Sequence, residues 1–366
     1  MSPKSDSATP AARLASVDAL RGLAVAAMLL VNNPGSWDHV WWPLEHAEWH
    51  GCTPTDLIFP FFLFIVGVSL SLALGPRLDR GTPAATLLPG LLKRAMRIVA
   101  LGLLLHLLAW WLMHKPEFRL MGVLQRIGLC FAVVSVVALR LRTRGQWLLI
   151  AALALGYWAL LLLGGLPPDP FSKLGNLASR VDAALLGRWA YEFAPASGIG
   201  HDPEGLLSTL GALLSALLGL RAGEALRAGA RGPLLLGGLL ALGLAWIWSA
   251  WLPFNKQLWT PSFALWTSGW AALALALAHQ LIDRQAWPAI GRSFGVNAIA
   301  AYAGAWMCTV FLEGFGWMQP LYAGAFGWLG PLIGPLGQSH AFALAFVAVW
   351  ALIVRLLDKR GIYFKV

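Results

Sequence analysis

Histidine and carboxylate side chains are concentrated in one short stretch of the chain, between residues 34 and 56. In order, the stretch holds Asp38, His39, Glu45, His46, Glu48, His50 and Asp56. Acid–base chemistry uses such groups, because a histidine ring is partly neutral near pH 7 and a nearby carboxylate can orient it. The stretch is therefore the first candidate for a catalytic site.

Several residues of this stretch also have a structural explanation. Thr53 and Asp56 fit the start of a helix, as its N-cap and as an acid at the positive end of its dipole. His46 and His50 have the i,i+4 spacing of two metal ligands on a helix, but no third ligand stands at a suitable spacing. We therefore expect no metal, and we interpret Cys52 as a small residue before a helix rather than as a nucleophile.

Polar residues elsewhere in the chain are predicted to lie at the same end of the protein. They are Asn32, Gln125, Arg126, Asp202, Glu204, Lys256 and Gln257. Arg126 is the most informative of them, because an arginine inside an apolar segment needs an anionic partner. We expect Arg126 to be buried and either paired with Asp56, Asp202 or Glu204, or in contact with a substrate.

The elements that position these residues are membrane helices. Of the 366 residues, 58% are hydrophobic and 12% are charged, whereas soluble domains carry about 25% charged residues. Long apolar runs recur along the chain, which is typical of a protein dissolved in lipid. We predict an all-α polytopic membrane protein with ten transmembrane helices, at residues 17–33, 56–75, 96–113, 120–139, 147–166, 205–221, 232–252, 261–281, 294–313 and 339–357.

Two segments between the predicted helices need separate assignment. Residues 167–203 form the longest polar stretch and are predicted to be a loop with a helical piece. Pro331, Pro335 and five glycines interrupt residues 318–337, so we predict a re-entrant or surface loop rather than an eleventh span. The chain then divides into a polar N-terminal tail, 1–15, and a single transmembrane domain, 16–366.

The placement of the positive charges predicts the orientation. The net charge is +10, but Lys and Arg cluster in short links between apolar runs, so we expect a membrane partner and no nucleic acid. With the N-terminus in the cytoplasm, 20 of the 27 Lys and Arg fall inside and 6 outside, and Arg126 lies within a span. We therefore predict cytoplasmic termini in a bacterial inner membrane, with the histidine-rich stretch in the periplasm.

Several motifs, in order over residues 13–366, resemble those of the heparan-α-glucosaminide N-acetyltransferase family of transmembrane acyltransferases. They are SVDALRG at 16–22, VNNPG at 31–35, HAEWHGCTPTDLIFP at 46–60, FIVG at 64–67, GVLQRIG at 122–128, DPEG at 202–205 and KRGIYFK at 359–365. The chain resembles the short bacterial form of the family, without the luminal N-terminal domain of the lysosomal enzyme.

The resemblance implies that acetyl passes from cytosolic acetyl-CoA to a glucosamine-type acceptor on the far side of the membrane. The family's catalytic histidine, in an H-A-x-W-x-G motif, falls on His46. Its functional asparagine falls on Asn32, with Asn33 as the alternative. A homodimer is also expected from the family.

The remaining site residues are assigned by chemistry within this resemblance. Asp56 would orient His46, and the acceptor would be contacted by Trp49, Gln125, Arg126, Asp202 and Glu204. The CoA phosphates would bind cations at the cytosolic mouth, for which the candidates are Arg13, Arg21, Lys93, Arg94 and Arg97. His46 would act as the base in a direct transfer, which we prefer, or would carry the acetyl group in a ping-pong route.

Two other classes of function stay open. A glycan or glycolipid transporter or flippase would have the same helices and the same polar pocket, but would need neither His46 nor CoA. A structural or assembly subunit would need no chemical site at all. Binding of CoA separates the enzyme from both.

Overall fold

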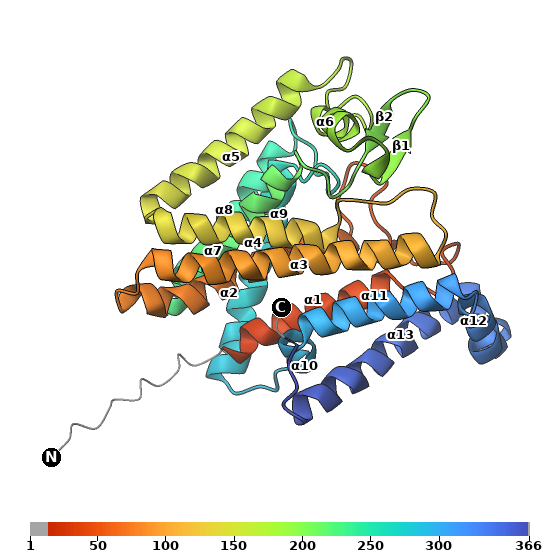
Figure 1. The fold of residues 1–366 in the computed structure, drawn as a ribbon. Coiled ribbons are helices and arrows are strands. Elements are labelled where there is room, and N and C mark those ends of the chain that lie inside the picture. Colours follow the sequence, from red (N-terminus) through yellow and green to blue (C-terminus); the bar gives the residue numbers. More distant parts are fainter. Residues whose placement is uncertain (1–13, 365–366) are drawn as a thin grey trace.

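The computed structural model describes residues 14–364, so Arg13 and most of the predicted N-terminal tail lie outside the described residues. Ten long helices form the body of the described chain (Figure 1). Their bounds are α1 (Ala15–Val31), α2 (Ile58–Asp79), α3 (Ala84–Leu112), α4 (Val123–Arg140), α5 (Thr143–Gly164), α7 (Thr209–Arg227), α8 (Arg231–Trp248), α9 (Pro261–Ala278), α11 (Ala298–Gly314) and α13 (Gly330–Lys359).

Short elements lie in the connections between these helices. They are α6 (Leu177–Leu186), α10 (Arg292–Val296), α12 (Met318–Phe326) and the antiparallel strands β1 (Glu192–Ala194) and β2 (Ile199–His201). Helix α6 is the helical piece that was predicted within residues 167–203. The small hairpin after it was not predicted, because strands of three residues are too short to show an alternating pattern.

The predicted all-α polytopic architecture is confirmed. Within residues 14–364, eight helices are long and apolar enough to cross a membrane. Helices α1 and α11 are 17 residues long, just below that length, so every predicted helix has a counterpart. The largest boundary error is at α3, which begins at Ala84 rather than at residue 96.

The segment 318–337 differs from its prediction, because it is helical rather than a loop. Helix α12 and a 3-10 turn, Gly327–Leu329, lead directly into α13. The break expected from the proline is confined to Gly334, whose φ of 73° kinks the helix just before Pro335. A glycine adopts this backbone conformation without steric cost, so helical structure resumes beyond the kink.

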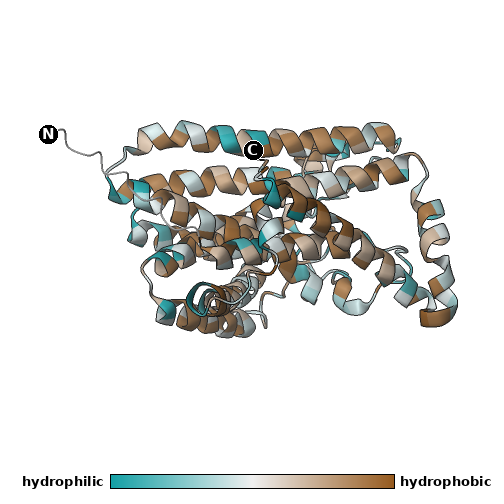
Figure 2. Cartoon of the chain, turned by 90° about the horizontal axis from the view of Figure 1, so that it is seen from below, coloured by the Kyte–Doolittle hydropathy of each residue, from teal (hydrophilic) through white to brown (hydrophobic). Residues whose placement is uncertain are grey.

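The centre of the bundle is built on close contact between α2 and α7. A Cβ atom added at Gly67 would lie 2.0 Å from the carbonyl oxygen of Ala216, and one added at Gly219 would lie 2.0 Å from that of Phe64. Glycines at both contacts let the two backbones approach each other, as is common between membrane helices. Helices α7 and α9 are mostly buried, whereas α5 and α8 are mostly exposed. Figure 2 shows hydrophobic residues along most of the length of the helices.

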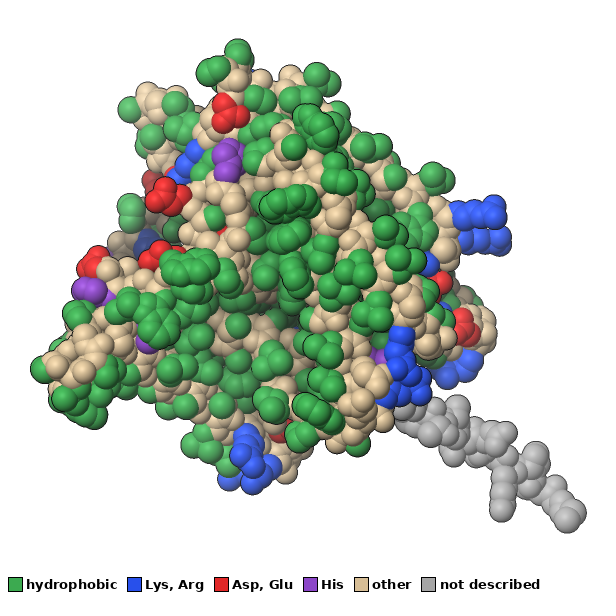
Figure 3. All heavy atoms as spheres, turned by 180° about the vertical axis from the view of Figure 1, so that it is seen from behind, with side chains coloured by type: hydrophobic (Ala, Val, Ile, Leu, Met, Phe, Trp, Pro, Cys, Tyr) green, Lys and Arg blue, Asp and Glu red, His purple; other side chains and the backbone are tan. Residues whose placement is uncertain are grey.

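Because successive helices run in opposite directions, their connections collect at two ends of the bundle. We name the first the His46 end, formed by residues 32–57, 113–122, 165–208 and 249–260. We name the second the arginine end, formed by the shorter connections 80–83, 141–142, 228–230 and 285–291. In Figure 3, most of the visible acidic side chains and histidines lie on the left side of the view.

Candidate active site

His46 is held in place by Asp56. Nδ1 of His46 lies 2.7 Å from Oδ1 of Asp56, and the histidine side chain is 47% exposed whereas the aspartate is 1% exposed. The other carboxylate oxygen accepts hydrogen bonds from the backbone N–H groups of Ala47, at 3.1 Å, and Thr53, at 3.0 Å. A carboxylate bound to Nδ1–H leaves Nε2 without a proton, so Nε2 is the ring atom available as a base.

Asp56 occupies this position because the local sequence starts a helix there. Pro54–Leu57 forms a 3-10 turn that leads into α2, and Thr53 and Asp56 make a reciprocal capping box at its start. The capping role and the histidine-orienting role were alternative interpretations of Asp56. The structure shows that one carboxylate oxygen caps the turn and the other contacts His46.

Lys256 is the third member of this group. Its Nζ lies 2.9 Å from Nδ1 and 3.0 Å from Nε2 of His46, and 3.7 Å from Oδ1 of Asp56. The sequence placed Lys256 at the same end of the protein but gave no reason to put it beside His46. The next residue, Gln257, donates from Nε2 to the carbonyl oxygen of Glu48 at 3.3 Å. Residues 249–260 are thereby attached to the loop that carries His46.

The two asparagines at the end of α1 lie in different environments. Asn32 is exposed, and within residues 14–364 its side chain makes no hydrogen bond to His46 or Asp56. Asn33 is buried, donates from Nδ2 to the carbonyl oxygen of Leu29 at 2.7 Å, and accepts from Thr309 Oγ1 at 2.6 Å. Asn33 thus joins α1 to α11.

The structure separates the other histidines of the loop from His46. Residues 46–50 are not helical, so the i,i+4 spacing of His46 and His50 does not place the two rings on one face. His50 lies 3.4 Å from Asn255 Nδ2, and His39 lies 3.4 Å from Ser36 Oγ. No group of three metal-ligating side chains occurs within residues 14–364.

Cys52 lies close to the site, but its environment disfavours a thiolate. Burial, reinforced by the negative charge of Asp56, raises the pKa of the Cys52 thiol to about 12. The thiol points to the carbonyl oxygen of Thr53, 3.7 Å away. A nucleophilic cysteine needs the opposite, an environment that lowers the pKa.

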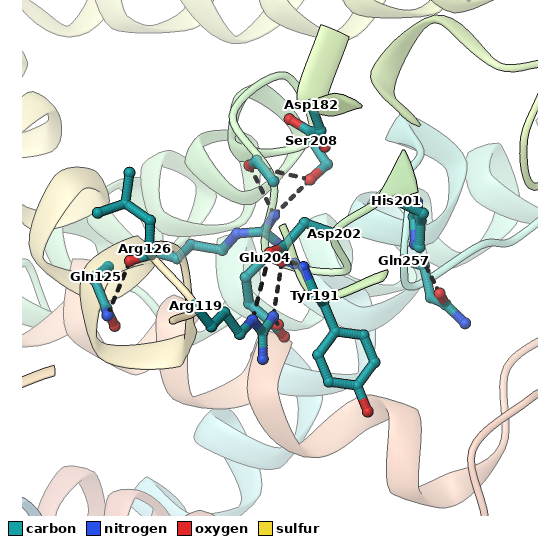
Figure 4. Close-up of polar contacts among 12 residues, drawn as sticks. Arg119, Gln125, Arg126, Asp182, Tyr191, His201, Asp202, Glu204, Ser208 and Gln257 are labelled. Atoms are coloured by element: carbon teal, nitrogen blue, oxygen red, sulfur yellow. Dashed lines mark hydrogen bonds and ion pairs between the residues drawn. The ribbon is translucent and has the colours of Figure 1, made fainter. Parts of the chain in front are cut away.

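Arg126 is fully buried as predicted, but the predicted ion pair is wrong. Its guanidinium donates to Ser208 Oγ and, at 3.1 Å, to the carbonyl oxygen of Gly205, and it lies 5.3 Å from the ring centroid of Trp259. Within residues 14–364 no carboxylate forms an ion pair with Arg126. Figure 4 shows that a different arginine forms the ion pairs with Asp202 and Glu204.

That arginine is Arg119, in the loop before α4. It donates to Asp202 Oδ1 at 2.7 Å and also contacts Glu204. Burial alone would favour the neutral acid at Glu204, but Arg119, Arg126 and Lys256 together hold the pKa of Glu204 below its usual value. The two carboxylates likewise raise the pKa of Arg119 above its usual value, against the effect of burial. The sequence missed Arg119 because a polar residue in a predicted loop needs no partner.

Gln125 and Trp49 are both used to join elements together. Gln125 Nε2 donates to the carbonyl oxygen of Leu120 at 3.1 Å and lies 3.3 Å from His106 Nδ1. Trp49 Nε1 donates to the carbonyl oxygen of Phe171 at 2.7 Å, and its half-buried ring meets the edge of His201.

Two further buried groups at the His46 end were not among the predicted site residues. His201 contacts Ser179 and Gln257, each at 2.8 Å, and burial lowers the pKa of His201. Asp182 accepts from the backbone N–H of Leu206 at 2.8 Å, and burial raises the pKa of Asp182 to about 7. No motif marks either residue, since both lie in the polar segment 167–203.

A cavity of about 1250 Å³ runs along α1 through the bundle. Its wall includes Val17 and Met28, which lie near opposite ends of α1, and Val123 and Leu124 at the start of α4. The basic side chains in the wall all lie nearer the arginine end, and they are Arg21, Arg94, Arg97, Arg227 and Arg284. The cavity thus joins a cationic region to the half of the bundle that carries His46.

Three of the arginines predicted to bind CoA are in this wall, and the predicted lysine is not. Arg21 also pairs at 2.9 Å with Asp18, which lies three residues earlier on α1. Arg94 and Arg97 project from α3 into the same wall. Lys93 is exposed and lies outside it.

Comparison with known proteins identifies a common group of relatives. Residues 13–167 match the family described as "Heparan-alpha-glucosaminide N-acetyltransferase, catalytic". With 97% of its length aligned, the chain is 29% identical to heparan-alpha-glucosaminide N-acetyltransferase of Homo sapiens and 28% identical to that of Mus musculus. It spans 60% of the length of each of these relatives. The chain is therefore similar to the heparan-alpha-glucosaminide N-acetyltransferases over most of its own length, in agreement with the resemblance of its motifs.

Proposed function

We propose that the chain is a membrane acetyltransferase that moves an acetyl group from acetyl-CoA to an amino sugar or a sugar hydroxyl. The donor binds in the cavity from the arginine end, and the acceptor binds at the His46 end. The cavity is the observation that carries this proposal. It offers cations for the phosphates of CoA and a mostly apolar path toward the His46 end.

The dimensions of the cavity support a long ligand rather than a compact one. Val17 and Met28 are eleven residues apart on one helix, which corresponds to about 16 Å at 1.5 Å per residue. Pockets for small ligands are commonly about 300–1,000 Å³, and this cavity is larger, at about 1250 Å³. An anionic head joined to an extended arm has the matching shape and charge.

In the proposed reaction His46 is the base. The nitrogen or oxygen of the acceptor attacks the acetyl carbonyl carbon while His46 Nε2 takes the proton that the acceptor loses. The carbonyl π electrons move to oxygen, and when they return the carbon–sulfur bond breaks. The proton held by His46 then passes to the departing thiolate, which leaves as CoA thiol. Asp56 keeps the ring in the required tautomer throughout.

The residues predicted to contact the sugar acceptor fall into two groups according to their surroundings in the structure. Arg126, Gln125, Asp202 and Glu204 are engaged with other protein groups. We assign these four to supporting the loops, which leaves His46 and the half-buried ring of Trp49 to face the sugar. Aromatic rings at such a mouth offer an apolar face with a polar edge.

The orientation of the protein in the membrane is part of the proposal. The arginine end is assigned to the cytoplasm of a bacterial inner membrane, where acetyl-CoA is available, and the excess of Lys and Arg there supports this assignment. A cysteine introduced at residue 38 is expected to react with an impermeant thiol reagent in intact cells, and one at residue 142 is expected not to. Labelling of residue 142 from outside would contradict the assignment.

The experiment that tests the function uses the purified protein in detergent. Acetyl-CoA is expected to raise the thermal unfolding temperature, and radiolabelled acetyl is expected to pass to glucosamine in a protein-dependent manner. Desulfo-CoA, which has no thiol, should still stabilise the protein, since the phosphates supply the binding. Absence of both stabilisation and transfer would reject the enzyme and favour a glycan transporter.

A further inference from the structure

Lys256 occupies an unusual position relative to the ring of His46. Its Nζ lies 2.9 Å from Nδ1 and 3.0 Å from Nε2. The two ring nitrogens flank the Cε1 carbon, so an atom almost equally close to both cannot be in line with either lone pair without colliding with Cε1. The ammonium therefore lies over the face of the imidazole, and the in-plane lone pair of Nε2 stays open.

The position of Lys256 is set by a rigid loop. Asn255 Oδ1 accepts a hydrogen bond from the backbone N–H of Leu258 at 2.8 Å. Thr260 Oγ1 accepts a hydrogen bond from the backbone N–H of Asn255 and donates one to the carbonyl oxygen of Pro253. The N–H of Gly51 donates to the carbonyl oxygen of Phe254 at 2.7 Å, which fixes this loop to the loop of His46. A side chain held this way is pre-organised relative to the ring.

Burial and the neighbouring carboxylates act on the pKa of Lys256 in opposite directions. Its side chain is 19% exposed, and burial lowers the pKa of Lys256, although the charges of Asp56 and Glu204 oppose this effect. Cys52 also faces the ammonium, but as a neutral thiol. Asp56 is already bonded to His46, Ala47 and Thr53 and lies farther from Nζ than the ring does. Neutralisation of Asp56 alone therefore does not account for the placement of the lysine.

We infer that Lys256 is a further catalytic residue of the proposed acetyl transfer, whose ammonium stabilises the oxyanion that forms as the acceptor attacks the thioester. The inference rests on the proposed function. An oxyanion donor acts at about 2.7–3.1 Å from the developing charge. Nζ is 3.0 Å from Nε2, so the acetyl oxygen of a group being attacked beside Nε2 falls within its reach. Asn32, which the family resemblance marks as functional, makes no hydrogen bond to this ring within residues 14–364.

The chemistry makes the charged form of Lys256 the active one. When the carbonyl electrons move to oxygen, an ammonium offers a full positive charge and three donors, whereas a neutral amine offers neither. The rate must then fall as pH rises through the pKa of Lys256. Because that pKa is lowered in the folded protein, the fall belongs below the ordinary lysine value of about 10.4.

The first test measures kcat and KM for acetyl transfer to glucosamine. Lys256→Met is expected to lower kcat by about 100-fold or more, the usual effect of losing one oxyanion donor, with KM for acetyl-CoA unchanged. Lys173→Met is the matched control, because Lys173 is an exposed lysine at the same end that pairs with Glu192. A kcat of Lys256→Met within threefold of wild type would overturn the inference.

The second test uses the pH profile and does not require Lys256→Met to fold. Wild-type kcat is expected to decline at a pH below the ordinary lysine pKa of about 10.4, while the unfolding temperature stays level. In Lys256→Arg the decline should disappear, because arginine stays charged over this range. A flat wild-type profile, or a decline that tracks unfolding, would overturn the inference. If wild type transfers no acetyl at all, it is the proposed function that fails.

Discussion

The charged residues around His46 and two arginines of the cavity wall at the opposite end, Arg94 and Arg97, are held in different ways. At the His46 end most charges have fixed protein partners, such as Asp56 with its three neighbours and Arg119 with its two acids. At the arginine end, Arg94 and Arg97 line the cavity, and neither forms an ion pair with a carboxylate of residues 14–364. Arg21 and Arg227 in the same wall do have protein partners, which are Asp18 and Asp79. The guanidinium of Arg94 lies instead 5.3 Å from the ring centroid of Phe131.

The difference follows from what each end has to bind in the proposed reaction. A base must be oriented before its substrate arrives, so its partners belong to the protein. A site for phosphates needs cations whose partner is the ligand, and cations already neutralised by the protein would bind phosphate weakly. Substitutions at the two ends should therefore affect different measurements.

The largest effect is expected from removing the arginine that holds two acids. Arg119→Met leaves Asp202 and Glu204, whose side chains are 0% and 12% exposed, without their cation. Breaking a buried pair in this way costs roughly 3–5 kcal/mol, and we expect about 3 kcal/mol because Arg119 is partly exposed. Thermal unfolding in detergent measures the loss.

Lys173→Met is the control for that substitution, because it breaks an exposed pair with Glu192 worth at most about 1 kcal/mol. Arg126→Met should also lower stability, but by less than Arg119→Met, since it leaves no carboxylate unpaired. Equal stability of all three variants would mean that the His46 end is not held by its buried charges.

The next largest effect is expected at the proposed base, His46. His46→Ala should lower acetyl transfer by about 100-fold or more, the common contribution of acid–base catalysis, and about 2.7 kcal/mol when converted at 1.36 kcal/mol per tenfold. Stabilisation by acetyl-CoA should be unchanged, because the arginines are at the other end. Transfer kinetics and thermal shifts are measured on the same preparation.

His39→Ala is the matched control, since His39 lies in the same loop but contacts Ser36 rather than Asp56. Wild-type rates in His46→Ala would refute the assignment. Radiolabelled acetyl-CoA without acceptor separates the two routes, because a label retained on wild type and lost in His46→Ala would favour ping-pong over direct transfer.

The smallest effect is expected at the arginine end. Replacing Arg94 and Arg97 together with alanine should raise KM for acetyl-CoA by about tenfold, near the lower range for losing charged hydrogen bonds, with kcat unchanged. The effect should shrink at high salt, which screens exposed charges. Lys93→Ala is the control on the same helix, because Lys93 lies outside the cavity wall. A change in kcat without a change in KM would contradict the assignment of these arginines to the binding of acetyl-CoA.

The helices and their grouping into two ends could be predicted from the sequence alone. A membrane helix depends on the summed hydrophobicity of about 20 residues, so single misjudged residues change only the boundaries, as at α3. Because successive helices run in opposite directions, each loop can then be assigned to one end of the bundle. The choice of His46 as the candidate base also came from the sequence, because its motif is local and resembles that of a family of acyltransferases.

The contacts within the site depended on the tertiary structure. The sequence could not choose between Arg119 and Arg126 as the partner of Asp202, since they are seven residues apart and only the path of the loop before α4 decides which one reaches it. The sequence left two interpretations of Asp56 open, and the structure shows that each of its two carboxylate oxygens serves one of them. Lys256 stands 210 residues from His46 in the chain. A polar contact requires atoms placed within about 3 Å, and only the packing of the loops determines positions that closely.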